Sequence, residues 1–202
     1  MKKGRKTRQR ILETAVREAS TVGFEGLSIG GLAKATDMSK SGLFAHFGSK
    51  EDLQVAVLDT ARERFVEKVM EPALTRPRGE PRLRALFEGW LDWEEGEVAP
   101  GGCPFLVAAW EFDDRPGAVR DEVVRVLAKL AGALEKAVRL GVDAGHFRPD
   151  TDTAQVVYEL HGIILTFHLH HRLLRGEDSR VRARAAFEAL LARVRDGEGD
   201  DG

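Results

Sequence analysis

Residues 28–50, SIGGLAKATDMSKSGLFAHFGSK, constrain the fold of this chain more than any other stretch. Apolar side chains recur at i, i+3 and i+4 on either side of the turn-prone segment 36–38, which predicts two short helices separated by a tight turn. Ser28, Ser39 and Ser49 each precede a helical pattern, where a hydroxyl can accept a hydrogen bond from a backbone N–H of the opening turn. The small core expected around these helices consists of Ile11, Leu12, Ala15, Val16, Ala19, Phe24, Leu27, Ile29, Leu32, Ala33, Leu43, Phe44 and Phe47.

Two helices joined by a turn of about 3–4 residues form the helix-turn-helix unit, whose second helix enters the major groove of DNA. The outer side of the second predicted helix carries small or hydrogen-bonding residues, which permit close approach to base edges and phosphates. An ordinary helical hairpin with a polar face has the same pattern, so the motif alone leaves both interpretations open. The outer residues are Ser39, Lys40, Ser41, Gly42, Ala45 and His46.

Residues 39–53, SKSGLFAHFGSKEDL, closely resemble the signature of the tetracycline-repressor (TetR/AcrR) family of transcription regulators. The preceding sequence is also similar, through Arg10-Ile11-Leu12, Gly23-Phe24, Ser28-Ile29 and Leu32-Ala33. The resemblance covers roughly the first 55 residues and is specific there. It implies a DNA-binding head followed by a helical body that binds a small effector and dimerises.

The resemblance also guides the choice of DNA-contacting residues. The family often has tyrosine where Phe44 and His46 stand, and a charged or polar residue where Gly30 stands. Because a phenylalanine ring cannot hydrogen-bond to a phosphate, His46 is expected to make that contact alone. Groove contacts are expected from Lys40, Ser41, Gly42 and His46, and phosphate contacts from Ser28, Ser39 and Lys50.

Charge is distributed unevenly along the chain. Residues 1–50 carry ten Lys/Arg and four Asp/Glu, a net charge of +6, so the remainder carries −8 of the overall −2. A basic head on an acidic body suits a protein whose head docks on DNA while its body is repelled by phosphate. A solvated basic terminus is the alternative. We expect residues 1–7 to be a basic arm, disordered without DNA, in which Arg5 and Lys6, with Arg8 just beyond, can contact phosphates or the minor groove.

Apolar spacing of three to four residues continues through the rest of the chain, and alternating patterns are scarce, so the predicted fold class is all-α. We expect a three-helix helix-turn-helix DNA-binding domain at 1–49, a larger helical ligand-binding and dimerisation domain at 50–195, and an acidic disordered tail at 196–202. The helix at about 50–73 is long enough to transmit a ligand-induced tilt from body to head. The helices are expected at about 7–21, 50–73, 82–95, 105–112, 116–140, 152–175 and 179–195.

Aromatic residues cluster in the middle of the chain, within the part that the resemblance implies to be an effector-binding body. An aromatic side chain at helical spacing is most often a core residue, and core packing is the alternative for each of them. A pocket lined by some of them would accept a small apolar or aromatic effector. The residues expected to line it are Trp90, Phe105, Trp110 and Tyr158.

His161, His168 and His171 are spaced so that all three can share a helical face. Imidazole is a common metal ligand, but carboxylate or cysteine partners at ligand spacing are not nearby, so we expect no metal site. The preferred interpretation is that these histidines pack in the core or face a second subunit. Histidines that face a second subunit would make the subunit contacts sensitive to pH.

The single cysteine, Cys103, excludes an internal disulfide. A lone cysteine is usually a small buried residue. Its place after Gly101-Gly102, near a predicted helix start, can instead lower the pKa of its thiol and make it a sensor of oxidants or electrophiles.

Together these patterns predict a transcription regulator that is not an enzyme and needs no cofactor, since the chain has no glycine-rich phosphate loop, no GxSxG and no HExxH. The expected form is a homodimeric repressor that a small molecule releases from a pseudo-palindromic double-stranded DNA operator. The expected dimer surface is the pair of helices at about 152–175 and 179–195, in a four-helix interface. The alternatives are an activator or ligand-independent regulator of the same fold, and a helical ligand carrier or enzyme without DNA function.

The sequence also bears on location. The longest uncharged apolar-leaning run, residues 98–110, is shorter than the roughly 18 residues that a membrane span needs. No apolar region follows the basic N-terminus, as it would in a signal peptide. We therefore expect a cytoplasmic protein that does not enter the membrane.

Overall fold

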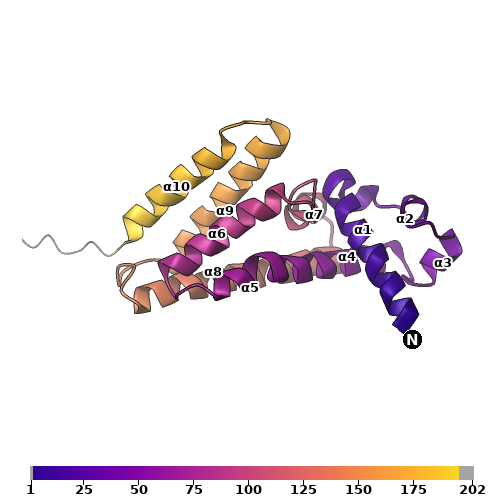
Figure 1. The fold of residues 1–202 in the computed structure, drawn as a ribbon, viewed down its shortest axis with the longest axis horizontal. Helices are drawn as coiled ribbons and strands as arrows, with labels where there is room; N and C mark the ends of the chain where they lie inside the picture. The colour runs from indigo at the N-terminus through magenta and orange to yellow at the C-terminus, as the bar shows by residue number, and fades with distance from the viewer. Residues whose placement is uncertain (1, 196–202) are drawn as a thin grey trace, which may run out of the picture. The chain divides into compact units, whose positions relative to one another are not determined.

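The computed structural model describes residues 2–195, which form helices joined by short loops (Figure 1). The all-α prediction is therefore confirmed for this part of the chain; the predicted tail at 196–202 lies outside the described residues. The elements are α1 (Lys2–Gly26), α2 (Ile29–Ala35), α3 (Lys40–Phe44), α4 (Lys50–Phe65), the π-helix η1 (Val66–Met70), α5 (Glu71–Leu74), α6 (Glu80–Glu95), α7 (Pro104–Phe112), α8 (Ala118–Asp143), α9 (Thr153–His168), the π-helix η2 (Leu169–Leu173) and α10 (Ser179–Val194).

The chain divides into two compact units. Unit 1 comprises the residues up to 66 together with 93–127, and unit 2 comprises 67–92 together with the residues from 128 onward. The division therefore falls within α6 and within α8, and just after α4. The predicted functional division between residues 49 and 50 stays a prediction.

In unit 1, α1 packs against α4 and α7 through an apolar stripe that is almost completely buried. The predicted core is confirmed in most positions because residues at helical spacing from α1, α2 and α4 face one another. Gln54 lies within this core, where its amide donates to the carbonyl of Phe24 at 2.8 Å. The α1 contribution consists of Ile11, Leu12, Ala15, Val16 and Ala19.

Two expectations for unit 1 are wrong. Helix α1 begins at Lys2, so the expected disordered arm at 1–7 is helical from that residue onward. Its long straight-chain residues have good helix propensity and continue without a break into the amphipathic stretch. Phe44 is 52% exposed, whereas it was expected in the core. Leu43 of α3 and Phe47 just after this helix fill the core, and a residue one position from Leu43 on a helix is rotated about 100° away from it.

In unit 2, α9 and α10 lie side by side (Figure 1), and α6 packs against α10 through Phe87, whose ring stacks on Phe187 at 4.1 Å. Ion pairs reinforce this contact: Arg84 donates to Glu188 at 2.8 Å, and Arg195 donates to Glu80 at 2.7 Å. Buried apolar side chains and ion pairs therefore both connect α6 to α10.

Apolar spacing in the sequence predicts that Val181, Ala185, Leu190, Leu191 and Val194 form the inward stripe of α10, and this prediction needs one correction. Val181 is 68% exposed and Ala185 is also exposed, because the buried stripe begins instead at Ala183. Leu174, expected to face inward at the end of the α9 pattern, is 58% exposed. The stripe of α10 that is buried consists of Ala183, Phe187, Leu190, Leu191 and Val194.

Candidate DNA interface

Two serine caps mark the starts of the two helices of the predicted helix-turn-helix. The hydroxyl of Ser28 accepts from the N–H of Gly31 at 2.9 Å, and that of Ser39 accepts from the N–H of Gly42 at 3.1 Å. These bonds satisfy N–H groups that a helix leaves free in its first turn. The hydroxyl of Ser39 also lies 3.2 Å from that of Ser41, and either of the two can be the donor. The expected phosphate contacts of Ser28 and Ser39 stay predictions.

The turn between α2 and α3 depends on one unusual backbone conformation. Asp37 has φ 54°, in the left-handed region that aspartate tolerates better than most residues. The next N–H, from Met38, donates to the carbonyl of Ala33 at 2.8 Å. The side chain of Arg10 in α1 donates to the carbonyl of Thr36 at 3.3 Å. The turn is thus closed within itself and attached to α1.

The outer face of α3 is formed by residues that the core does not use. Lys40, Ser41, Phe44 and Ala45 are exposed, whereas Leu43 is completely buried. An ideal Cβ on Gly42 would lie 3.1 Å from the hydroxyl of Ser39, so the small residue there leaves room for the cap. His46 is half-buried, with its ring 6.3 Å from that of Phe47.

Gly30 and Lys40 are neighbours. An ideal Cβ on Gly30 would lie 3.3 Å from Cε of Lys40, so the lysine side chain passes over this position. The missing side chain at position 30 therefore makes space for the lysine of the second helix. The sequence shows this departure from the family pattern, but only the packing gives its physical reason.

Lys50 is attached to the end of α1. Its ammonium donates to the carbonyl of Glu25 at 2.7 Å and lies 3.8 Å from a carboxylate oxygen of the same residue. Helix α4 starts here with the expected cap, since the N–H of Asp52 donates to the hydroxyl of Ser49 at 3.0 Å. Lys50 thus links the end of α1 to the start of α4, and its expected phosphate contact stays a prediction.

Sequence reasoning missed how the end of α1 is anchored. Gly23 interrupts the helix with φ 78°, and the freed N–H groups of Phe24 and Glu25 donate to the carboxylate of Glu111 at 2.8 and 3.1 Å. Nearby, the N–H of Gly101 donates to the hydroxyl of Ser20 at 2.9 Å. In the sequence, Gly23 and the Gly101-Gly102 pair indicate breaks in the helices. They do not indicate which distant groups bond to the backbone at those breaks.

Two family models match the chain. The model described as bacterial regulatory proteins of the tetR family matches residues 11–57, and the tetracyclin repressor-like C-terminal domain matches residues 79–187. The second match alone covers more than half of the chain. The chain belongs to the TetR family. It is therefore a DNA-binding transcription regulator of a family that is not enzymatic.

Curated relatives and solved structures agree with this assignment. The chain is similar to the transcriptional repressor AcnR of Corynebacterium glutamicum, with 39% identity over 190 residues that cover 91% of this chain and 86% of AcnR. It is 25% identical to the regulator TcmR of Streptomyces glaucescens over 201 residues, or 96% of this chain and 85% of TcmR. A TetR regulator from Chloroflexus aurantiacus superposes with a TM-score of 0.86, at 26% identity, over 96% of this chain and 99% of that one.

In this TetR-family fold, the four residues expected to line an effector pocket are divided between the two units. Trp110 in unit 1 and Tyr158 in unit 2 are 57% and 75% exposed. Phe105 packs in unit 1 against Phe65, with ring centroids 5.9 Å apart. Trp90 packs in unit 2 against His161 at 5.7 Å. Core packing accounts for the two buried rings, and an effector site at these residues stays a prediction.

The remaining candidates of this TetR regulator have structural surroundings of their own. Burial lowers the pKa of His161, which lies against Trp90, and the ring of His171 stacks on Phe167 at 5.3 Å. His168 lies in the last turn of α9. Among residues 2–195, no group of three His, Cys, Asp or Glu side chains is placed to hold a metal ion.

Cys103 is completely buried, and burial raises the pKa of its thiol well above the usual value, with the Glu94 carboxylate adding to the rise. The interpretation of Cys103 as a small buried residue is therefore confirmed. The alternative of a lowered thiol pKa is contradicted, because the thiol is removed from water and lies near a negative charge. Within the described part of the chain, no helix is long and apolar enough to cross a bilayer.

Proposed function

We propose that this TetR-family regulator is a homodimeric repressor that binds a pseudo-palindromic operator and is released from it by a small molecule. The observation that carries the proposal is the exposed face of α3, which presents Lys40 and Ser41 beside the capped turn. A lysine and a hydroxyl can donate to base edges and phosphates. On this proposal, residues 1–49 bind DNA and residues 50–195 bind the effector and dimerise.

On this proposal, the DNA contacts come from α3, the two caps and Lys50. Lys40, Ser41, Gly42 and His46 face the groove, and the α2 and α3 caps with Lys50 position phosphates. The net charge of +6 over residues 1–50 adds a sequence-independent attraction to the phosphate backbone. The description of AcnR as a transcriptional repressor supports the sign of regulation, because the two chains align over most of their lengths.

The dimer is supported by an apolar surface on α9, η2 and α10. Six large apolar side chains there are at least 38% exposed. A contiguous exposed apolar patch is typical of a protein–protein interaction site. Self-association of this surface around a twofold axis would bury them in a four-helix interface. These residues are Tyr158, Leu165, Leu169, Leu173, Leu174 and Val181.

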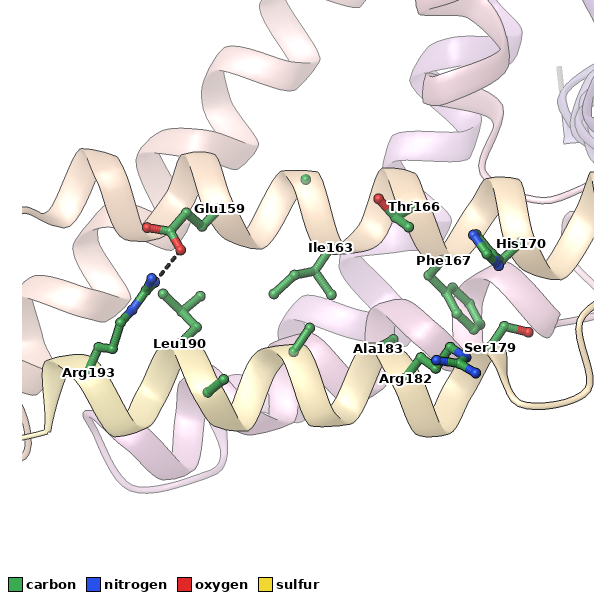
Figure 2. A pocket seen from close by; sticks show the side chains of 13 residues that line it. Glu159, Ile163, Thr166, Phe167, His170, Ser179, Arg182, Ala183, Leu190 and Arg193 are labelled. Carbon is green, nitrogen blue, oxygen red and sulfur yellow. Dashed lines mark hydrogen bonds and ion pairs between the residues drawn. The ribbon is translucent and has the colours of Figure 1, made fainter.

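A groove of about 640 Å³ follows the line between α9 and α10 (Figure 2). Ile163 points into it from α9, and at one end Arg193 of α10 donates to the carboxylate of Glu159. Small residues leave room for a helix of a second copy to approach closely. They are Gly162, Ala183, Ala186 and Ala189.

The ligand response is proposed by analogy with regulators of the same fold. AibR was solved in complex with isovaleryl coenzyme A and operator DNA, and superposes on this chain with a TM-score of 0.69, at 23% identity, over 93% of this chain and 97% of AibR. We propose that an effector favours a body conformation in which the two heads no longer match the operator spacing. Such coupling is typically worth ~1–3 kcal/mol and is reciprocal.

The test is selection of bound sequences from a pool of random duplex DNA, using the full chain at modest salt. Enrichment of an inverted repeat with half-sites about one helical turn apart, ~34 Å, is the expected result. Enrichment of a single half-site would remove the dimer from the proposal, and no enrichment would remove sequence-specific binding. A footprint of the enriched site upstream of its promoter, instead of over it, would favour an activator.

A further inference from the structure

Nothing in the fold of the isolated chain explains why the ring of Phe44 is exposed. It is 52% exposed at the end of α3, while Leu43 beside it is completely buried and Phe47 is 2% exposed. Leaving such a ring in water forfeits part of the free energy that burying a phenylalanine contributes. A smaller or polar residue would suit this position in an isolated head.

The neighbours of Phe44 place it within the proposed DNA-binding surface. It follows Lys40 by four positions and Ser41 by three, and residues so spaced on a helix are adjacent. All three side chains are exposed. Any duplex that contacts the lysine and the serine would therefore also meet the ring.

The chemistry of the ring selects its partner. It has no hydrogen-bonding atom, so it cannot distinguish the donors and acceptors of base edges, nor bind a phosphate oxygen. The major groove offers one apolar group on a base, the C5 methyl of thymine, which is suited to contact with apolar side chains including phenylalanine.

We propose that Phe44 is a specificity-determining residue that packs on the C5 methyl of a thymine in each operator half-site. This inference rests on the proposed function, because it requires α3 to lie in the major groove. It adds a non-polar contact to the expected polar ones.

The experiment uses the full chain and the duplex enriched from the random pool. Each thymine of a half-site is replaced in turn by deoxyuridine, which removes only the methyl group, and affinity is measured by fluorescence anisotropy. One thymine per half-site is expected to show a loss of about fourfold, the equivalent of one buried methyl group. In Phe44→Ala, overall affinity falls about tenfold and the same replacement has no further effect.

Two further variants separate the contact from general effects. Phe44→Tyr keeps the ring and should keep the thymine dependence. Val22→Ala removes another apolar side chain of unit 1, 56% exposed on α1, and should leave both affinity and thymine dependence unchanged. Circular dichroism melts should be the same for Phe44→Ala and the wild type, because the ring is exposed.

The outcomes are distinguishable. Specific binding by the wild type with no thymine dependence overturns the inference and leaves the proposed function intact. Thymine dependence that persists in Phe44→Ala also overturns it, because another residue then contacts the methyl. Failure of the wild type to enrich any sequence overturns the proposed function and this inference with it.

Discussion

The carboxylate of Glu111 in α7 accepts a hydrogen bond from the backbone N–H of Phe24, 2.8 Å away, at the kink near the end of α1. The same oxygen accepts from Glu25 at 3.1 Å. A Cβ on Gly23 would lie 1.9 Å from the other carboxylate oxygen, so only glycine leaves room for this acceptor. The residues leading into Ser28, the first cap of the helix-turn-helix, are thus fixed by a side chain 87 positions further along the chain.

Glu111→Ala should lower the free energy of unfolding by about 1–3 kcal/mol, because it leaves the N–H groups of Phe24 and Glu25 without their acceptor. Glu111→Gln should lower it less, since its amide oxygen can still accept. Chemical denaturation measures both. Asp114→Ala, in the exposed turn after α7, is the matched control and should change little. An unchanged stability in Glu111→Ala would show that this anchor does not contribute.

Lys40→Ala should weaken operator binding and reduce the slope of log K against log salt by about one for each α3 in the groove, because each lysine that contacts a phosphate releases counterions. The measurement is a salt titration of affinity on the enriched duplex. Lys129→Ala removes an exposed lysine of α8 and should leave the slope unchanged. An unaltered slope in Lys40→Ala would remove this lysine from phosphate contact.

Leu173→Asp should dissociate the proposed dimer. Leu173 is 72% exposed on η2, and burying an aspartate in an apolar interface carries a desolvation cost that its new partners would not offset. Sedimentation velocity across a concentration series gives the dissociation constant. Val124→Asp places the same charge on α8 at a residue that is 52% exposed, and should leave the oligomeric state unchanged. Equal dissociation constants for Leu173→Asp and wild type would contradict this surface.

Glu80 should make the stability of the protein depend on pH in the acid range. Hydrogen bonds from Arg195, and then Arg84, lower its pKa from 4.5 to about 2. Because the folded-state pKa is depressed, the contribution of Glu80 is fully present above pH 4.5 and is lost as pH falls toward 2. At pH 7, Glu80→Gln should lower Tm by roughly 2–4 °C, equivalent to about 1 kcal/mol after solvent screening.

The difference in Tm between wild type and Glu80→Gln should narrow as pH decreases below 4.5, where the wild-type carboxylate begins to lose its advantage. Thermal melts at pH 7, 4.5 and 3 test this, with Glu71→Gln in the same unit as the matched control. A constant difference across this range would show that the charge of Glu80 does not contribute. No difference at pH 7 would show that solvent screening cancels the ion pairs.

Cys103 should not react with a thiol reagent in the native protein at pH 8. Its side chain is completely buried, so the reagent cannot reach it. Burial also raises the pKa of its thiol, so the reactive thiolate form is scarce at this pH. Addition of denaturant should expose one reactive thiol. Rapid labelling without denaturant would restore the sensor hypothesis.

The sequence by itself determined the features that depend on neighbours within about four residues. The serine caps, the tight turn and the short helices follow from side chains that bond to their own first turn. The helix-turn-helix signature also indicated the family, which the comparisons confirm. Apolar periodicity placed most of the core correctly, because a helical stripe must be buried whatever covers it.

The tertiary structure decided which distant groups meet. The Glu111 carboxylate anchors α1, Lys40 passes over Gly30, and Arg195 binds Glu80 across 115 positions of sequence. The tertiary structure also placed Phe44 on the outside of unit 1, since Leu43 and Phe47 already fill the core there. Local patterns cannot specify such pairs, because a helix of given amphipathicity packs in several orientations and only the summed contacts of the whole fold select one.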